Sequence, residues 1–475
     1  MMMMMILSLL LHMLMFVSST TATTTPIRIA FGSCNMVKFE QPLWNVLSAR
    51  DDYDAFVFGG DNIYADRRTP ITQRFWNRYI TKDNKSSAQF LPATPTILRQ
   101  MYAKQNDNPD FTRFRSKVPV FLGIWDDHDY GINDGDRRYE YREESQSIFL
   151  DFFNVSKNDP RRFRRGIYHA RTLRRNDVSI KLYLLDVRYH RDPWTTSEQQ
   201  PSENSILGEE QWTWLKSELE NDDDIDLAIF VSGFQVLPQT PFVYTAETWA
   251  REFASKRELQ RLLVNVQRRG VSTLLLSGDV HFSEVNEEIC IDNDDVSYRI
   301  AEFTSSGMTH AWQGETMNWP APPIGPWIFR IGFSVANSIA SYFNVNMVRT
   351  RDMKFAGRNV GEIEVTQDRV VVRSLDTQGE TRFERRWAMS ELRSFANIER
   401  MSTKIWCAPQ YFGGPTVRDF QDGSGLSELR NREVYARIAL RSFILLVVLV
   451  PVFSCCCVCR LICSSSGKMK KKKLL

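Results

Sequence analysis

The chain has 475 residues, of which 25% are charged and 43% belong to the hydrophobic set. This length and composition allow one large or two ordinary globular cores. The formal net charge is only +3, because acidic runs such as Asp222–Asp224 offset basic clusters such as Arg161–Arg165. We interpret both kinds of cluster as solvated surface, and we expect no binding to nucleic acid.

The amino-terminal segment has the composition of a secretory signal peptide. Residues Met1 to Val17 are almost wholly apolar, and small polar residues follow as far as Thr25. We therefore predict a signal peptide over residues 1–22, with cleavage near Ala22. The first five residues are methionines without a Lys or Arg, so an uncleaved signal anchor is the alternative.

From Pro26 onward, apolar segments alternate with longer amphipathic or polar ones, which is typical of an α/β domain. We expect this domain to occupy residues 26–400. Strands are predicted at 28–31, 55–58, 118–124, 179–186, 226–232 and 273–277. Helices are predicted at 139–153, 209–220 and 249–267. Two β-rich segments, 361–366 and 369–374, flank a short turn and predict a hairpin added to a sheet edge.

The carboxyl-terminal segment is predicted to anchor the chain in a membrane. Residues 401–441 lack a convincing strand pattern and contain glycine-rich turns, so we interpret them as a stalk. No charge occurs over the 18 residues from Ser442 to Cys459, which predicts a single transmembrane helix at 442–463. Residues 464–475 would form a basic cytosolic tail, with the body on the lumenal side as in a type I protein.

The last four residues, Lys472-Lys473-Leu474-Leu475, resemble the dilysine signal that returns membrane proteins to the endoplasmic reticulum. Such a signal implies recognition by coat proteins and residence in the endoplasmic reticulum, with the cell surface as the alternative. A stop-transfer cluster of positive charges is an equally good interpretation of the same lysines.

Four of the apolar runs end at residues that can bind a metal ion. Because the carboxyl ends of parallel strands open onto a common crevice, we expect these side chains to converge on one site. A single ending of this kind is a weak signal, since Asp and Gly close many strands for turn reasons alone. The metal-binding side chains at the four ends are Cys34, Asp61, Tyr64, Asp127, His128, Asp279 and His281.

The order of these motifs resembles that of the alkaline phosphatase D (PhoD-like) family of calcineurin-like metallophosphoesterases, from about Ile27 to Thr377. The resemblance implies a four-layer α-β-β-α sandwich that acts on phosphate esters. It also implies a bimetallic or trimetallic site with iron(III) beside calcium. The motifs are Gly32-Ser33-Cys34-Asn35, Gly60-Asp61-Asn62-Ile63-Tyr64-Ala65-Asp66, Trp125-Asp126-Asp127-His128-Asp129, Leu185-Asp186-Val187-Arg188, Ser277-Gly278-Asp279-Val280-His281-Phe282 and Glu302 to His310.

Roles for individual residues follow from the chemistry together with this resemblance. Oxygen ligands suit Ca²⁺, whereas thiolate and phenolate favour a more Lewis-acidic ion such as Fe³⁺. We assign Asp61 as the bridge between metals and His128 as the general acid that protonates the leaving alkoxide. Arg188 is the candidate phosphate clamp. The assigned metal ligands are Cys34, Asp61, Tyr64, Asp127, Asp279 and His281.

Other polar residues near these motifs have simpler interpretations. We expect Asp126 and Asp129 to be turn residues or supports for the ligands. His310 enters only as a possible site-lining residue, and the role of Asp66 stays open. His169 and His190 have no motif support, so we expect them to be structural.

Two further features fit an exported body. If Cys34 holds a metal, Cys290 and Cys407 are the remaining lumenal cysteines, and we predict a disulfide between them. The sequons at Asn84 and Asn154 are consistent with glycosylation, although such tripeptides are common by chance.

The leading hypothesis is a membrane-tethered phosphohydrolase in which a metal-activated hydroxide attacks phosphorus. Monoesters are the default substrate, and phospholipid or nucleotide diesters are the alternative. A catalytically silent scaffold with the same fold is the rival from another class. We consider it weaker because decay of a catalytic site normally removes ligands, and here the ligand set is complete.

Overall fold

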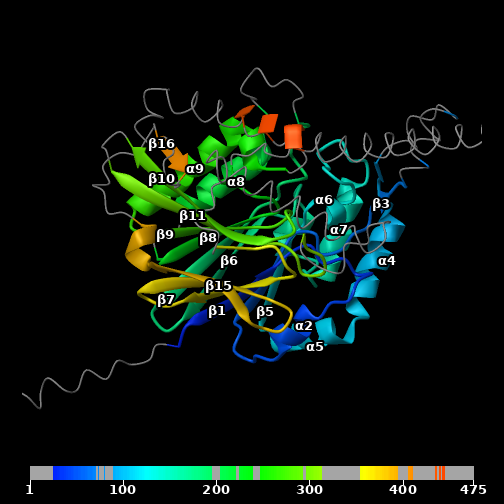
Figure 1. Cartoon of the computed structure of the whole chain (residues 1–475), viewed down its shortest axis with the longest axis horizontal. Coiled ribbons are helices and arrows are strands. Elements are labelled where there is room, and N and C mark those ends of the chain that lie inside the picture. Colours follow the sequence, from blue (N-terminus) through cyan, green and yellow to red (C-terminus); the bar gives the residue numbers. More distant parts are fainter. Residues whose placement is uncertain are drawn as a thin grey trace, which may run out of the picture.

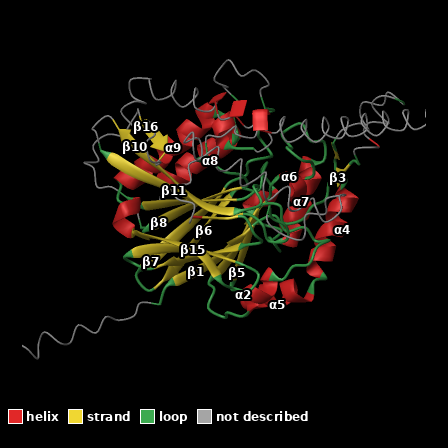
Figure 2. Ribbon diagram, in the orientation of Figure 1, coloured by secondary structure: helices red, strands yellow, loops and turns green. Residues whose placement is uncertain are grey.

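The structure is a computed structural model, and it places two stacked β-sheets at the centre of the molecule (Figure 1). The described residues are 25–70, 73, 80, 89–194, 204–220, 224–238, 247–292, 296–312, 353–393, 405–409, 434–435, 438–439 and 441–443. Helices lie outside the sheets, and Figure 2 shows them flanking the strands.

The first sheet has six strands in the order β15-β14-β13-β1-β2-β5. Strands β1, β2 and β5 run parallel to one another, whereas β13, β14 and β15 form an antiparallel extension from β1. The predicted hairpin is therefore present as β13 and β14, but β15 pairs beyond it at the edge. The bounds are β1 (Ile27–Gly32), β2 (Ala55–Gly59), β5 (Val120–Ile124), β13 (Val360–Val365), β14 (Arg369–Leu375) and β15 (Thr381–Ala388).

The second sheet has eight strands in the order β12-β10-β11-β9-β8-β7-β6, with β16 pairing to β10 as well. Strands β7, β8, β9 and β11 are parallel. The bounds are β6 (His169–Arg175), β7 (Val178–Leu184), β8 (Leu227–Ser232), β9 (Ser272–Ser277), β10 (Ser283–Asp292), β11 (Ser297–Ser305), β12 (Lys354–Phe355) and β16 (Ile405–Pro409). A separate two-stranded ribbon joins β3 (Arg67–Arg68) to β4 (Phe90–Leu91).

The helices cover the outer faces of the two sheets. Trp44 packs on Phe56 and Phe58, with ring centroids 5.3 and 5.5 Å away, and so covers the first sheet. On the second sheet, Phe230 shares a buried cluster with Leu215 and Leu263 from two helices. The helices are α2 (Leu43–Ser48), α4 (Pro95–Asn106), α5 (Pro109–Lys117), α6 (Asp127–Tyr130), α7 (Arg142–Phe152), α8 (Gly208–Glu220) and α9 (Phe253–Arg268).

The main core lies between the sheets. Ile29 from β1 and Leu182 from β7 are fully buried in the same apolar cluster. Every residue of β2 is buried, as expected for a strand of a parallel sheet that is covered on both faces. Truncating one of the large core side chains, such as Trp44, would cost about 3–5 kcal/mol of stability. The result is a mixed α/β fold with its layers in the order helix, sheet, sheet, helix.

The prediction of a transmembrane helix at 442–463 has to be corrected. Within the described part of the chain, no helix has both the length and the apolar character needed to cross a bilayer. Only Ser442 and Phe443 of that range are described, and the remainder lies outside the described residues.

The predicted disulfide is confirmed. Cys290 and Cys407 are opposite each other on β10 and β16 and are joined by an S–S bond. Residues 405–409, which we assigned to the stalk, thus form a strand of the second sheet. The predicted signal peptide, the rest of the stalk apart from a few residues, and the basic tail lie outside the described residues.

Candidate metal centre

The predicted metal ligands gather where strands of both sheets end. Cys34 follows β1, Asp61 follows β2, and Asp127 begins α6 shortly after β5. From the second sheet, Asp279 and His281 follow β9. The apolar runs place the strands, and the stacking of the two sheets brings these ends together.

Four of the ligand positions have an unusual backbone conformation. The φ angles are positive at Cys34 (61°), Asp61 (52°), Asp279 (73°) and His281 (59°). Non-glycine residues seldom adopt this region, and such strain is concentrated at functional sites. Gly60 is also constrained, because a Cβ there would lie 2.6 Å from the Cβ of Asp126.

Asp61 is the hub of the first group of ligands. Tyr64 donates its hydroxyl to Asp61 Oδ2 at 2.9 Å, and Cys34 Sγ lies 3.6 Å from the same oxygen. The backbone N–H of His128 donates to Asp61 Oδ1 at 3.3 Å. Burial raises the pKa of Asp61, Tyr64 and Cys34. Crowded acidic groups of this kind favour a bound cation, which displaces their protons.

Asp127 connects this hub to two more groups of carboxylates, one with Asp126 and Asp279 and one with Asp134 and Glu247. Ligand atoms of Asp61, Asp127 and His128 lie within 4.8 Å of one another, and the same holds for Asp126, Asp127 and Asp279. The backbone N–H of Asp134 donates to Asp127 Oδ2 at 2.7 Å. Burial alone would raise the pKa of Asp127, but the charges of His128 and Arg188 outweigh it and lower that pKa to about 2.

His281 supplies the clearest sign that the donors suit a metal. Its Nδ1 is buried and has no hydrogen-bond partner within the described residues. Burial, with the nearby charge of His128, lowers the pKa of His281 to about 4, so its imidazole is neutral at pH 7. A neutral imidazole with an unpartnered nitrogen fits a bound metal ion. His281 nevertheless belongs to none of the groups whose ligand atoms lie within 4.8 Å of one another among the described residues.

His128 is held by Asp66, for which the sequence predicts no role. Its Nδ1 lies 2.6 Å from Asp66 Oδ1, and the other Asp66 oxygen accepts the N–H of Asn133 at 3.0 Å. Burial would lower the pKa of His128, but Asp127 and Asp66 raise it well above its ordinary value. The ring of Tyr64 packs at 4.2 Å from that of His128. Because Asp66 holds Nδ1, the other ring nitrogen, Nε2, is the one available for proton transfer.

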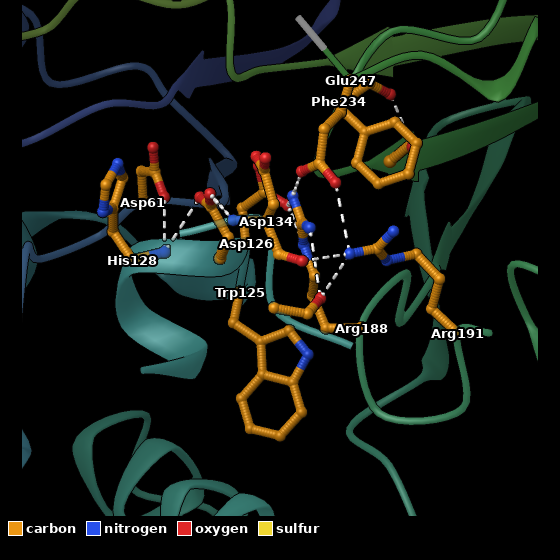
Figure 3. Close-up of polar contacts among 12 residues, drawn as sticks. Asp61, Trp125, Asp126, His128, Asp134, Arg188, Arg191, Phe234 and Glu247 are labelled. Atoms are coloured by element: carbon orange, nitrogen blue, oxygen red, sulfur yellow. Dashed lines mark hydrogen bonds and ion pairs between the residues drawn. The ribbon is translucent and has the colours of Figure 1, made fainter. Parts of the chain in front are cut away.

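The side chain of Arg188 is more deeply buried than we expect for a residue that contacts a substrate phosphate. It is 0% exposed, and its guanidinium forms ion pairs with Asp126 at 2.6 Å and Glu247 at 2.5 Å. Glu247 also pairs with Arg191 at 3.2 Å, as Figure 3 shows. These contacts assign Arg188 to holding Asp126 in place, and its contact with phosphate stays a prediction. No sequence motif pointed to Glu247.

Asp129 has the supporting role that we expected. Its carboxylate accepts the side-chain amide of Asn62 at 2.5 Å and the backbone N–H of Asp126 at 2.6 Å. It thereby ties the Asp61 loop to the start of α6. His310 also reaches the site, because its ring lies 4.3 Å from that of His281.

Paired sheets with acidic, thiol and imidazole donors at their strand ends, and a carboxylate-backed histidine beside them, define the class of metal-dependent hydrolases. The family model of PhoD-like phosphatases matches residues 29–374. The chain therefore belongs to the PhoD-like phosphatase family and is a phosphoric ester hydrolase, which confirms the resemblance stated above.

Solved structures add support for the fold alone. The chain is similar to one described as "Structure of PhoD" at 15% identity, with 87% of this chain and 78% of that chain covered and a TM-score of 0.53.

Two other solved structures match with TM-scores too low to support a common fold. A predicted phosphoesterase from Streptococcus pneumoniae has 9% identity, coverage of 77% and 99%, and a TM-score of 0.23. A hypothetical protein from Thermus thermophilus has 12% identity, coverage of 76% and 99%, and a TM-score of 0.28. No curated protein matches the chain.

Proposed function

We propose that this phosphohydrolase acts on phosphate monoesters, with iron(III) bound by Cys34, Asp61 and Tyr64 and calcium bound by neighbouring carboxylates. The observation that carries the proposal is the convergence of a thiol, a phenol and a shared carboxylate on one point, with Cys34 Sγ and Tyr64 Oη at 3.6 and 2.9 Å from Asp61 Oδ2. Soft or phenolic donors select a Lewis-acidic metal, and oxygen-only donors select calcium.

The chain's own groups supply positioning and proton transfer. Cations bound here neutralise charge on the phosphoryl oxygens and lower the pKa of water. Asp61 and Asp127 would hold the metal ions in place. Asp66 fixes the orientation of the His128 ring. His128 then donates its Nε2 proton to the leaving alcohol oxygen, which is the step that a poor leaving group needs most.

The experiment compares turnover of p-nitrophenyl phosphate and bis(p-nitrophenyl) phosphate by wild type, Asp61→Asn and Asp151→Asn. Asp151 is a matched control because it is a surface aspartate paired with Arg162. We expect the monoester to be cleaved faster and Asp61→Asn to lose at least about a hundredfold in kcat/KM. Preference for the diester would replace the monoester proposal, and no turnover of either by folded, metal-loaded protein would contradict both.

We also propose that the body resides in the secretory pathway. The disulfide between Cys290 and Cys407 supports this, since such bonds persist in oxidising compartments. The sequon asparagine Asn154 is exposed and open to glycosylation. Protein isolated from its native cells should carry no free thiol at Cys290 or Cys407, and two free thiols would contradict the location.

A further inference from the structure

The ribbon of β3 and β4 starts immediately after Asp66, the residue that holds His128. Its two cross-strand pairs are Arg67 with Leu91 and Arg68 with Phe90. Directly opposed residues of an antiparallel pair project from the same face, and successive residues project from opposite faces. Arg68 and Phe90 therefore share one face, while Arg67 is on the other.

Phe90 identifies which face is turned toward the catalytic site. Its ring is half-buried, and its centroid lies 5.8 Å from that of the His128 imidazole. A backbone hydrogen bond of 3.2 Å from Ala65 N to His128 O keeps the start of the ribbon against α6, because this bond joins the loop before β3 to α6. The face with Arg68 and Phe90 is thus the one beside the general acid.

Arg68 is exposed and has no ion pair or hydrogen bond in the part of the chain that the structure describes. Other arginines of the described residues are paired with carboxylates, for example Arg50 with Asp52 and Arg113 with Asp110 elsewhere on the molecule. An unpaired cation two residues beyond Asp66 is therefore available to an anion that arrives with the substrate.

We propose that Arg68 and Phe90 bind the alcohol half of the substrate. The inference rests on the proposed function, because His128 marks the side from which the alcohol leaves. Phe90 would pack against a planar or apolar part of that alcohol, and Arg68 would pair with a second anionic group, a carboxylate or a phosphate. The preferred substrates are then phosphate esters of apolar alcohols that carry a further negative charge.

The test uses phenyl phosphate and 4-carboxyphenyl phosphate, which differ by one carboxylate remote from the ester. Wild type should show the lower KM for the carboxylated ester. Arg68→Ala should raise that KM about tenfold and leave the KM for phenyl phosphate within about twofold. Phe90→Ala should raise the KM for phenyl phosphate about fivefold relative to methyl phosphate.

Arg67→Ala is the matched control, because Arg67 is equally exposed but lies on the opposite face of the ribbon. It should leave the ratio of the two KM values unchanged. Equal KM values in wild type, or an equal loss in Arg67→Ala and Arg68→Ala, would overturn the inference. Unchanged thermal unfolding of both variants would exclude a folding defect.

Binding separates a failure of this inference from a failure of the proposed function. Titration calorimetry with benzylphosphonate and 4-carboxybenzylphosphonate needs no turnover. The carboxylated compound should bind wild type and Arg67→Ala about tenfold more tightly than Arg68→Ala. Equal affinities in all three proteins would reject the role of Arg68, whatever the turnover assays show.

Discussion

At the scale of single residues, Asp66 decides how His128 can act. Its carboxylate contacts Nδ1 of the imidazole at 2.6 Å and is itself fixed by the Asn133 N–H at 3.0 Å. This leaves Nε2 of His128 as the nitrogen available for proton transfer. Asp66 is therefore a positioning residue, and its effect should depend on how much the leaving group needs a proton.

We expect Asp66→Asn to slow hydrolysis of an alkyl phosphate at least about tenfold, but to slow p-nitrophenyl phosphate much less. The p-nitrophenolate leaves without protonation, so correct placement of the acid matters little for it. Steady-state kinetics with both substrates measure the difference. Equal losses for both substrates would indicate a general structural defect instead.

His169, at the start of β6, makes the free energy of unfolding depend on pH. Its Nε2 is buried without a partner in the described residues. Burial, then the charge of Arg161, lowers the pKa of folded His169 to about 3 from an ordinary 6.5. Below pH 6.5, His169 is protonated in the unfolded chain but stays neutral in the folded chain. The free energy of unfolding therefore falls as the pH falls toward 3.

Chemical denaturation of wild type and His169→Asn between pH 4 and pH 8 measures this contribution. The wild type should lose up to about 1.4 kcal/mol of unfolding free energy per pH unit more than the variant below pH 6.5. The two slopes should coincide above pH 7. Parallel slopes over the whole range would show that His169 titrates normally in the folded state.

At the scale of elements, β16 is held by a covalent bond in addition to its pairing with β10. Among the described strands it pairs with β10 alone, and Cys407 joins it to Cys290 across 117 residues of sequence. Closing so long a loop restricts the unfolded chain more than the folded one. The disulfide thus stabilises the fold as well as this strand.

The double variant Cys290→Ala with Cys407→Ala should be less stable than wild type by up to about 4–5 kcal/mol, the loop-entropy limit for such a crosslink. Calorimetric unfolding of both proteins measures the change. Turnover at 25 °C should persist, since neither cysteine lies among the metal ligands. An unchanged unfolding temperature would contradict the stabilising role.

At the scale of the whole molecule, the metal centre links the two sheets. Asp61 and Asp127 follow strands of the first sheet, and Asp279 follows a strand of the second. Burial and then the charges of Asp126 and Asp127 raise the pKa of Asp279. Without a cation, these carboxylates repel one another across the junction between the sheets.

Removal of metal by a chelator should therefore abolish turnover and lower the unfolding free energy, by about 2.7 kcal/mol if metal is normally present at a hundred times its Kd. Metal analysis and calorimetry before and after dialysis measure both effects. Asp61→Asn should show a smaller change in stability on chelation. Full activity in protein shown to be free of metal would contradict a metal-dependent mechanism.

The sequence alone determined the strands that carry the ligand residues at their ends, whereas β6, β10, β11 and β15 had no prediction and β16 was assigned to the stalk. Runs such as Phe56 to Phe58 are continuous and apolar, and the ligands Asp61 and Tyr64 follow within a few positions. Such features depend on neighbouring residues only. The same local logic also produced the error at 442–463, since an uncharged run does not by itself define a transmembrane helix.

Only the tertiary structure decided which side chains meet. Asp66 reaches His128 across 62 positions, and Arg188 reaches Glu247 although no motif marks the glutamate. Arg68 and Phe90 become neighbours through the pairing of β3 with β4. These contacts depend on strand order and on the stacking of two sheets, which are set by burial of the whole core rather than by the local pattern of residues.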